Sequence, residues 1–155
     1  MNARRLTATA VLAVLGALLL AVPVSGVTPA GGTTSGDERL ATLRAQLTGE
    51  KEVPGPGDED GSGTAVVKVF RAKVCYTLKV ENIDPATAAH IHLGFRDEAG
   101  PVVAPLEPPT DGFSRACTQI PRALSRELRE HPRRYYVNVH NDEFPDGAIR
   151  GQLHR

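Results

Sequence analysis

The sequence lacks several features that common classes of protein need. Its only methionine is Met1, which argues against a thioether site for cuprous ion. No Gly-X-Ser-X-Gly nucleophile motif and no phosphate-binding glycine loop occurs, so an enzyme is disfavoured. No internal repeat is visible either. We therefore predict a non-catalytic protein that acts by binding.

Acidic residues are missing from the first part of the chain. Arg4 and Arg5 precede an apolar run over residues 6–24, and no acid occurs before or within this run. The pattern predicts a secretory signal peptide over residues 1–30, with either Gly26 or Ala30 as its last residue. The apolar run is also long enough for an uncleaved anchor. No cysteine lies near the cleavage region, which excludes a bacterial lipoprotein.

The chain also lacks an excess of charge. Its 18 Lys and Arg residues balance 18 acidic ones, and removal of the leader takes away only Arg4 and Arg5, which leaves a net charge near −2. This balance gives no support to nucleic acid as a partner. We expect a secreted, extracytoplasmic protein that does not meet a membrane unless the leader is uncleaved. Residues 31–39 are small and polar and predict a flexible spacer, followed by one domain over residues 40–155.

Cysteine is scarce, since only Cys75 and Cys117 are present. An even number of cysteines in an exported chain favours a disulfide, with two free thiols as the alternative. Cys75 alternates with the apolar residues of its strand. A bond from Cys75 would therefore join strands or loops on the outside of the fold.

Short alternating segments bounded by glycine and proline predict an all-β fold. One helix is predicted from Pro121 to about His131, with Leu124 and Leu128 facing inward and Pro132 ending it. The first strand segment is rich enough in alanine and leucine to form a short helix instead. We expect an antiparallel, Greek-key-like β-sandwich or barrel. The predicted strands are residues 40–47, 64–70, 73–82, 88–93, 102–106, 113–120, 135–140 and a last strand that ends at 153.

Two of these strands place histidine opposite an apolar face. His90 and His92 alternate with Ile91, and His140 alternates with Val139. Histidines two apart on a strand have Cα atoms about 6.5–7 Å apart, so both rings can reach one ion. If the two strands are neighbours, the three imidazoles predict a copper or zinc site. The alternative is that they make ordinary hydrogen bonds on a half-exposed sheet face.

Other charged residues are candidates for supporting roles. Glu52 and Asp142 could add oxygen ligands to the histidine site. Arg150 is expected to pair with a carboxylate of the turn at 142–146. The predicted helix carries arginines that suit a solvated charged face, and as an alternative they could bind a polyanion or an extracellular protein. These arginines are Arg122, Arg126 and Arg129.

Three sequence blocks resemble the chordin-type (CHRD) domain family. They are residues 47–54 (LTGEKEVP), residues 89–94 (AHIHLG), and residues 135–140 (YYVNVH) with 145–153 (PDGAIRGQL). The resemblance implies an extracellular, β-rich module that occurs in bacteria as a single secreted domain and in animals as repeats within chordin. It implies no established enzymatic activity. Its ligand in a single-domain protein does not follow from the resemblance.

A weaker resemblance links the chain to copper/zinc superoxide dismutase, another antiparallel β protein with a His-X-His pair on a strand. That resemblance implies copper ligands at His90, His92 and His140. The sequence departs from it, because it has no histidine-rich loop for a second metal and no bridging histidine. Superoxide chemistry is therefore a remote alternative.

Overall fold

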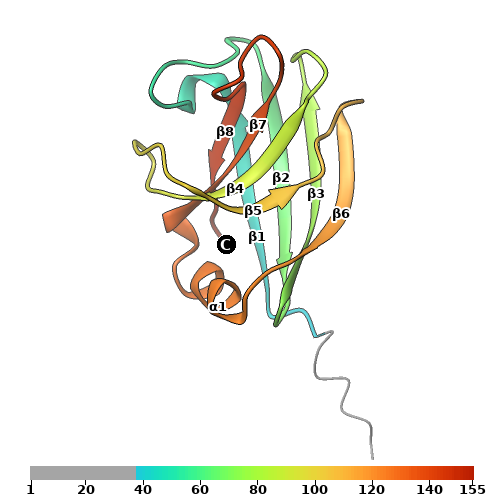
Figure 1. Cartoon of the computed structure of the whole chain (residues 1–155), viewed down its shortest axis with the longest axis vertical. Helices are drawn as coiled ribbons and strands as arrows, with labels where there is room; N and C mark the ends of the chain where they lie inside the picture. Colours follow the sequence, from blue (N-terminus) through green and yellow to red (C-terminus); the bar gives the residue numbers. More distant parts are fainter. Residues whose placement is uncertain (1–37) are drawn as a thin grey trace, which may run out of the picture. The chain divides into compact units, whose positions relative to one another are not determined.

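One antiparallel sheet of eight strands dominates the computed structural model, which describes residues 38–155 (Figure 1). The predicted signal peptide and nearly all of the predicted spacer lie outside the described residues. The strands follow the order β5-β4-β7-β8-β1-β2-β3-β6. Within the described part, no helix has the length and apolar character needed to span a membrane.

All predicted strands are confirmed to within two residues of their observed ends, as is the single predicted α-helix among residues 38–155. The strands are β1 (Ala41–Thr48), β2 (Ser62–Val69), β3 (Lys73–Glu81), β4 (Ala88–Leu93), β5 (Val102–Leu106), β6 (Phe113–Gln119), β7 (Tyr135–His140) and β8 (Ile149–Gln152). The helix is α1 (Arg122–Glu130), and two short 3-10 helices are η1 (Gly49–Lys51) and η2 (Pro132–Arg134).

The two edge strands, β5 and β6, are tied together by side chains. Thr118 Oγ1 donates to the carbonyl of Pro105 over 2.9 Å, and Ser114 Oγ donates to the carbonyl of Glu107 over 2.8 Å. The sheet therefore curls into a nearly closed barrel. Of the two predicted architectures, sandwich and barrel, the structure is closer to the barrel.

Alternation along the strands sends one set of side chains into the barrel and the other outward. The buried set includes Leu43, Val67, Leu78, Ile91 and Val137, all of which are 0% exposed. Helix α1 packs at one end of the barrel, where Leu128 is fully buried and Ser125 donates a hydrogen bond to the carbonyl of Phe70 in the β2–β3 hairpin. The apolar interior fixes which residues face outward, and this outer face carries the polar chemistry.

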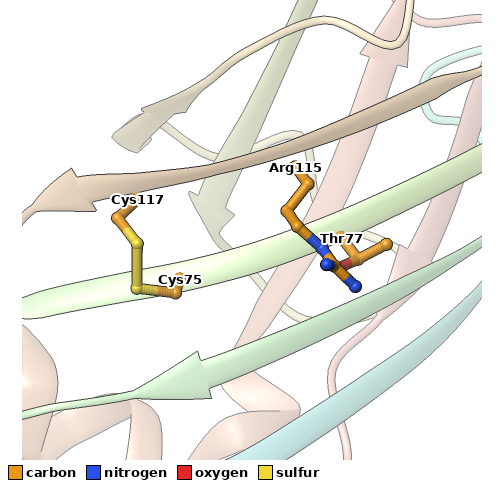
Figure 2. The surroundings of a disulfide bond; sticks show 4 residues. All are labelled: Cys75, Thr77, Arg115 and Cys117. Carbon is orange, nitrogen blue, oxygen red and sulfur yellow. A yellow bond between two sulfur atoms is a disulfide. The ribbon is translucent and has the colours of Figure 1, made fainter.

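The predicted disulfide is confirmed. Cys75 and Cys117 are direct partners in the β3–β6 register and form a bond of 2.08 Å (Figure 2). The bond lies on the outer side of the sheet, as alternation predicted. Two positions away on the same strands, Arg115 Nε donates to Thr77 Oγ1 over 3.4 Å. The edge strand β6 is thus attached to β3 covalently as well as by its ladder.

Candidate metal centre

The three predicted histidines meet on the outer face of two neighbouring strands. Strand β4 pairs with β7 in a register that places Ala88 opposite His140, and His90 opposite Asn138. His90, His92 and His140 each offer one ring nitrogen, and these three nitrogens all lie within 4.8 Å of one another. The sequence predicted a metal site only if these two strands are neighbours, and in the structure they are.

Backbone carbonyls fix the tautomer of two of these rings. His92 Nδ1 lies 2.8 Å from the carbonyl oxygen of Gly100, and His140 Nδ1 lies 3.0 Å from that of Pro145. A carbonyl oxygen can only accept, so each Nδ1 must carry the proton. The Nε2 atom of each ring is left with its lone pair. His92 Nε2 is buried and has no hydrogen-bond partner.

The third ring completes the cluster. His90 Nδ1 lies 3.2 Å from His140 Nε2. Because the His140 nitrogen holds a lone pair, His90 is the donor in this contact. The ring centroid of His90 lies 5.6 Å from that of His92 and 5.2 Å from that of His140, and the His92 and His140 centroids lie 6.4 Å apart, so the three rings form a compact triangle.

The environment keeps these imidazoles neutral. Burial lowers the pKa of His90, and the charges that His140 and His92 would carry lower it further. Burial also lowers the pKa of His92, against a raising effect of the Gly100 carbonyl. The pKa of His140 is lowered by burial, although the Pro145 carbonyl and Asp146 act in the opposite direction. Neutral imidazoles are the form that binds metal ions.

Tyr136 forms an aromatic layer beside the histidines. The ring of His92, on β4, stacks against it with centroids 4.8 Å apart and planes 14° from parallel. The Arg150 guanidinium, on β8, lies 3.5 Å from the Tyr136 ring centre. Since β7 lies between β4 and β8, the tyrosine is held between a histidine and a cation. This contact fixes the orientation of the His92 ring.

The structure corrects the role predicted for Arg150. Its guanidinium forms hydrogen bonds with another loop instead of with the turn at 142–146. It is 1% exposed and donates from NH2 to the carbonyls of Phe95, over 2.7 Å, and Glu98, over 2.9 Å. Arg150 therefore anchors the loop at 94–101, and the same loop supplies the Gly100 carbonyl that holds His92.

The oxygen ligands proposed from the sequence are not in the histidine group that the described residues form. Asp142 is exposed. Glu52 is 8% exposed and accepts a hydrogen bond from Asn138 Nδ2 over 3.2 Å. Burial raises the pKa of Glu52 to about 7, although the charge of Arg150 opposes this rise. Glu52 thus belongs to the layer of side chains beside the histidines.

The helix arginines lie elsewhere. Arg122 and Arg126 are exposed on α1, and Arg129 is partly buried. The same helix contributes Glu127 and Glu130 to a second group of adjacent ligand atoms, which His131 completes. Glu127 is already paired with Arg134 over 3.6 Å, so this second group is a weaker candidate than the histidine cluster.

Sequence reasoning missed the residues that hold the site in place. Alternation put Tyr136 and Asn138 on the histidine face, but no pattern marked their contacts with Arg150 and Glu52. The carbonyls of Gly100 and Pro145 carry no sequence signal, because every residue has the same backbone carbonyl group. Only the folded loops place them beside the rings.

The fold and the site define a small antiparallel β-barrel domain with a histidine cluster on its outer face. A family model described as CHRD domain matches residues 43–153, which is most of the chain. The chain belongs to the CHRD domain family. A comparison with curated proteins and one with solved structures found no match.

Proposed function

We propose that this CHRD-domain protein is a secreted, non-catalytic binding module that holds a copper or zinc ion at His90, His92 and His140. The observation that carries the proposal is the pair of carbonyl contacts at His92 and His140. Metal-binding histidines usually donate their second ring nitrogen to a carbonyl or carboxylate, which fixes the tautomer and aims the other nitrogen at the ion. Both rings follow this pattern.

The spacing of the nitrogens fits such an ion. Bonds of about 2.0–2.1 Å to one metal place two ligand nitrogens about 3.3–3.6 Å apart. The His90–His140 contact is 3.2 Å, and the three ligand atoms lie within 4.8 Å of one another. Small ring rotations would bring all three into range. His90 would then carry its proton on Nε2 and offer Nδ1 to the ion.

The chemical character of the donors limits the choice of metal. Three neutral imidazoles suit copper and zinc better than magnesium or calcium, which prefer oxygen ligands. With three protein ligands, a fourth position would stay open to water or to a further ligand. The family and the Cys75–Cys117 bond support secretion, since disulfides persist in oxidising compartments.

Metal titration of purified protein tests the proposal. We expect tight binding of one Zn²⁺ or Cu²⁺ per chain in the wild type and a loss of at least about tenfold in affinity for His92→Ala. His131→Ala is the matched control, because it removes the histidine of the second ligand group. Its affinity should equal that of the wild type. Equal affinity in wild type and His92→Ala would overturn the proposal.

A further inference from the structure

A basic pocket lies on the outer face of the sheet, beyond Arg150. It has a volume of about 160 Å³. Strand β8 and the neighbouring β1 form its floor, while η1 and the loop at 94–101 form its walls. Three of its side chains are Lys or Arg, and none of the described residues that line it is acidic. The lining residues are Gln46, Lys51, Arg96, Arg150, Gln152 and His154.

The pocket continues into two larger hollows, and we call the three together the basic groove. His154 lines all three hollows, so they adjoin one another. Phe95 and Arg133 line both of the larger ones, whose volumes are about 490 and 660 Å³. Arg155 adds positive charge at the far end, where Arg134 is paired with Glu127. Lysine and arginine side chains therefore outnumber acidic ones along the groove.

Internal hydrogen bonds hold the floor of the groove in place. Lys51 Nζ donates to the carbonyl of Gln46 over 2.9 Å. The amide of Gln152 donates to the carbonyls of Gly94 and Arg133, both over 2.8 Å. Arg150 is almost fully buried, and its NH1 atom has no hydrogen-bond partner. Water screens the charge of this buried guanidinium only weakly, so the charge favours an anionic ligand near this end of the groove.

We propose that the basic groove binds an extended acidic polysaccharide, whose sugars carry carboxylate or sulfate groups. The pocket at Arg150 would take one such anion, and the larger hollows would take the following sugars. Phe95 is 54% exposed at the rim and offers a flat apolar surface to a sugar ring. Gln46 offers its amide group to hydroxyls, and Gln152 offers its amide oxygen.

Nucleic acid fits the groove less well. Single-stranded nucleic acids need several aromatic side chains for base stacking, and Phe95 is the single Phe, Tyr or Trp among the described residues that line the groove. Asp97 and Glu130 also line it, and their carboxylates can accept hydrogen bonds from sugar hydroxyls. This inference does not depend on the proposed metal site.

Binding of oligogalacturonate and of dextran sulfate to the purified protein tests the groove, with uncharged dextran and a short oligothymidylate as comparison ligands. We expect both acidic glycans to bind at about 50 mM salt and to weaken steeply as salt rises. Uncharged dextran should not bind, and the oligothymidylate should bind more weakly than either acidic glycan.

Two variants with the same change of charge locate the site. Lys51→Gln/Arg96→Gln/Arg133→Gln should weaken glycan binding by at least about tenfold. Lys68→Gln/Arg122→Gln/Arg126→Gln removes three charges from other surfaces and should leave affinity within about twofold of wild type. No glycan binding, an equal loss in both variants, or tighter binding of the oligothymidylate would each overturn the proposal.

Discussion

His90 Nδ1 and His140 Nε2 face each other across 3.2 Å on neighbouring strands of the barrel. The Pro145 carbonyl holds the proton of His140 on the other ring nitrogen, so the facing nitrogen keeps a lone pair. His92 brings a second such nitrogen, which is buried and has no hydrogen-bond partner. The protein therefore holds ring nitrogens with free lone pairs close together, and such a group favours a bound cation.

Metal binding should raise thermal stability through this cluster. Zn²⁺ at about 100 times its dissociation constant adds about 2.7 kcal/mol to the free energy of unfolding, if it binds only the folded state. For a domain of this size, that corresponds to a rise in Tm on the order of 10 °C. Differential scanning calorimetry should show the rise in the wild type and lose most of it in His140→Ala. A full rise in that variant would place the ion elsewhere.

Glu52 should make stability depend on pH in a direction opposite to that of an ordinary carboxylate. Burial raises its pKa in the folded state from 4.5 to about 7, so the folded chain binds this proton more tightly than the unfolded chain. The free energy of unfolding therefore falls as pH rises from about 4.5 to 7, by about 3 kcal/mol in total. Glu52→Gln lacks this loss. Urea unfolding at several pH values should show the variant gaining on the wild type between pH 5 and 8, and parallel profiles would contradict the raised pKa.

The sequence predicted the strands and the histidine face because both follow from alternation. Ile91 and Val139 must face the core, so His90 and His140 must face away from it. Alternation says nothing about loops that return over the sheet. The loop at 94–101 covers this face, and Arg150 pairs with its carbonyls instead of with the turn at 142–146. A contact between a side chain and a distant carbonyl leaves no sequence pattern.

Gly147 should be intolerant of a side chain. It has φ +149°, and a Cβ atom there would lie 2.5 Å from Glu52 Oε2. Gly147→Ala should lower the free energy of unfolding by about 2 kcal/mol or more. Gly55→Ala is the control in the same segment as Glu52, since a Cβ at Gly55 would meet nothing within 4 Å. If the clash is the cause, Glu52→Ala should restore part of the stability in a double-mutant cycle. Equal effects at both glycines would exclude this explanation.

The disulfide should stabilise the barrel without affecting the histidines. Cys75 and Cys117 lie 42 residues apart in the sequence, and closing such a loop contributes about 4 kcal/mol in the chain-entropy model. Cys75→Ala/Cys117→Ala should unfold at a lower urea concentration by a corresponding amount. The bond joins β3 to β6, whereas the histidines lie on β4 and β7. Metal affinity of the folded variant should therefore be unchanged, and a lower affinity would show that the two regions are coupled.

Arg150 should control the order of the loop at 94–101 and, through it, the histidine site. Arg150→Met keeps an unbranched apolar stem but removes the hydrogen bonds to Phe95 and Glu98 and the cation from the Tyr136 ring. We expect a loss of about 3 kcal/mol in the free energy of unfolding, because the loop carbonyls lose a charged donor.

The readout that separates this positioning role from general destabilisation is local. Hydrogen exchange at residues 94–101 should accelerate more than exchange in β2 and β3, and Zn²⁺ affinity should fall because the Gly100 carbonyl no longer holds His92 firmly. Arg96→Met, in the same loop but exposed, should leave exchange and affinity near the wild-type values. A uniform increase in exchange across the barrel, with Zn²⁺ affinity preserved, would show that Arg150 supports the fold and not the histidine site.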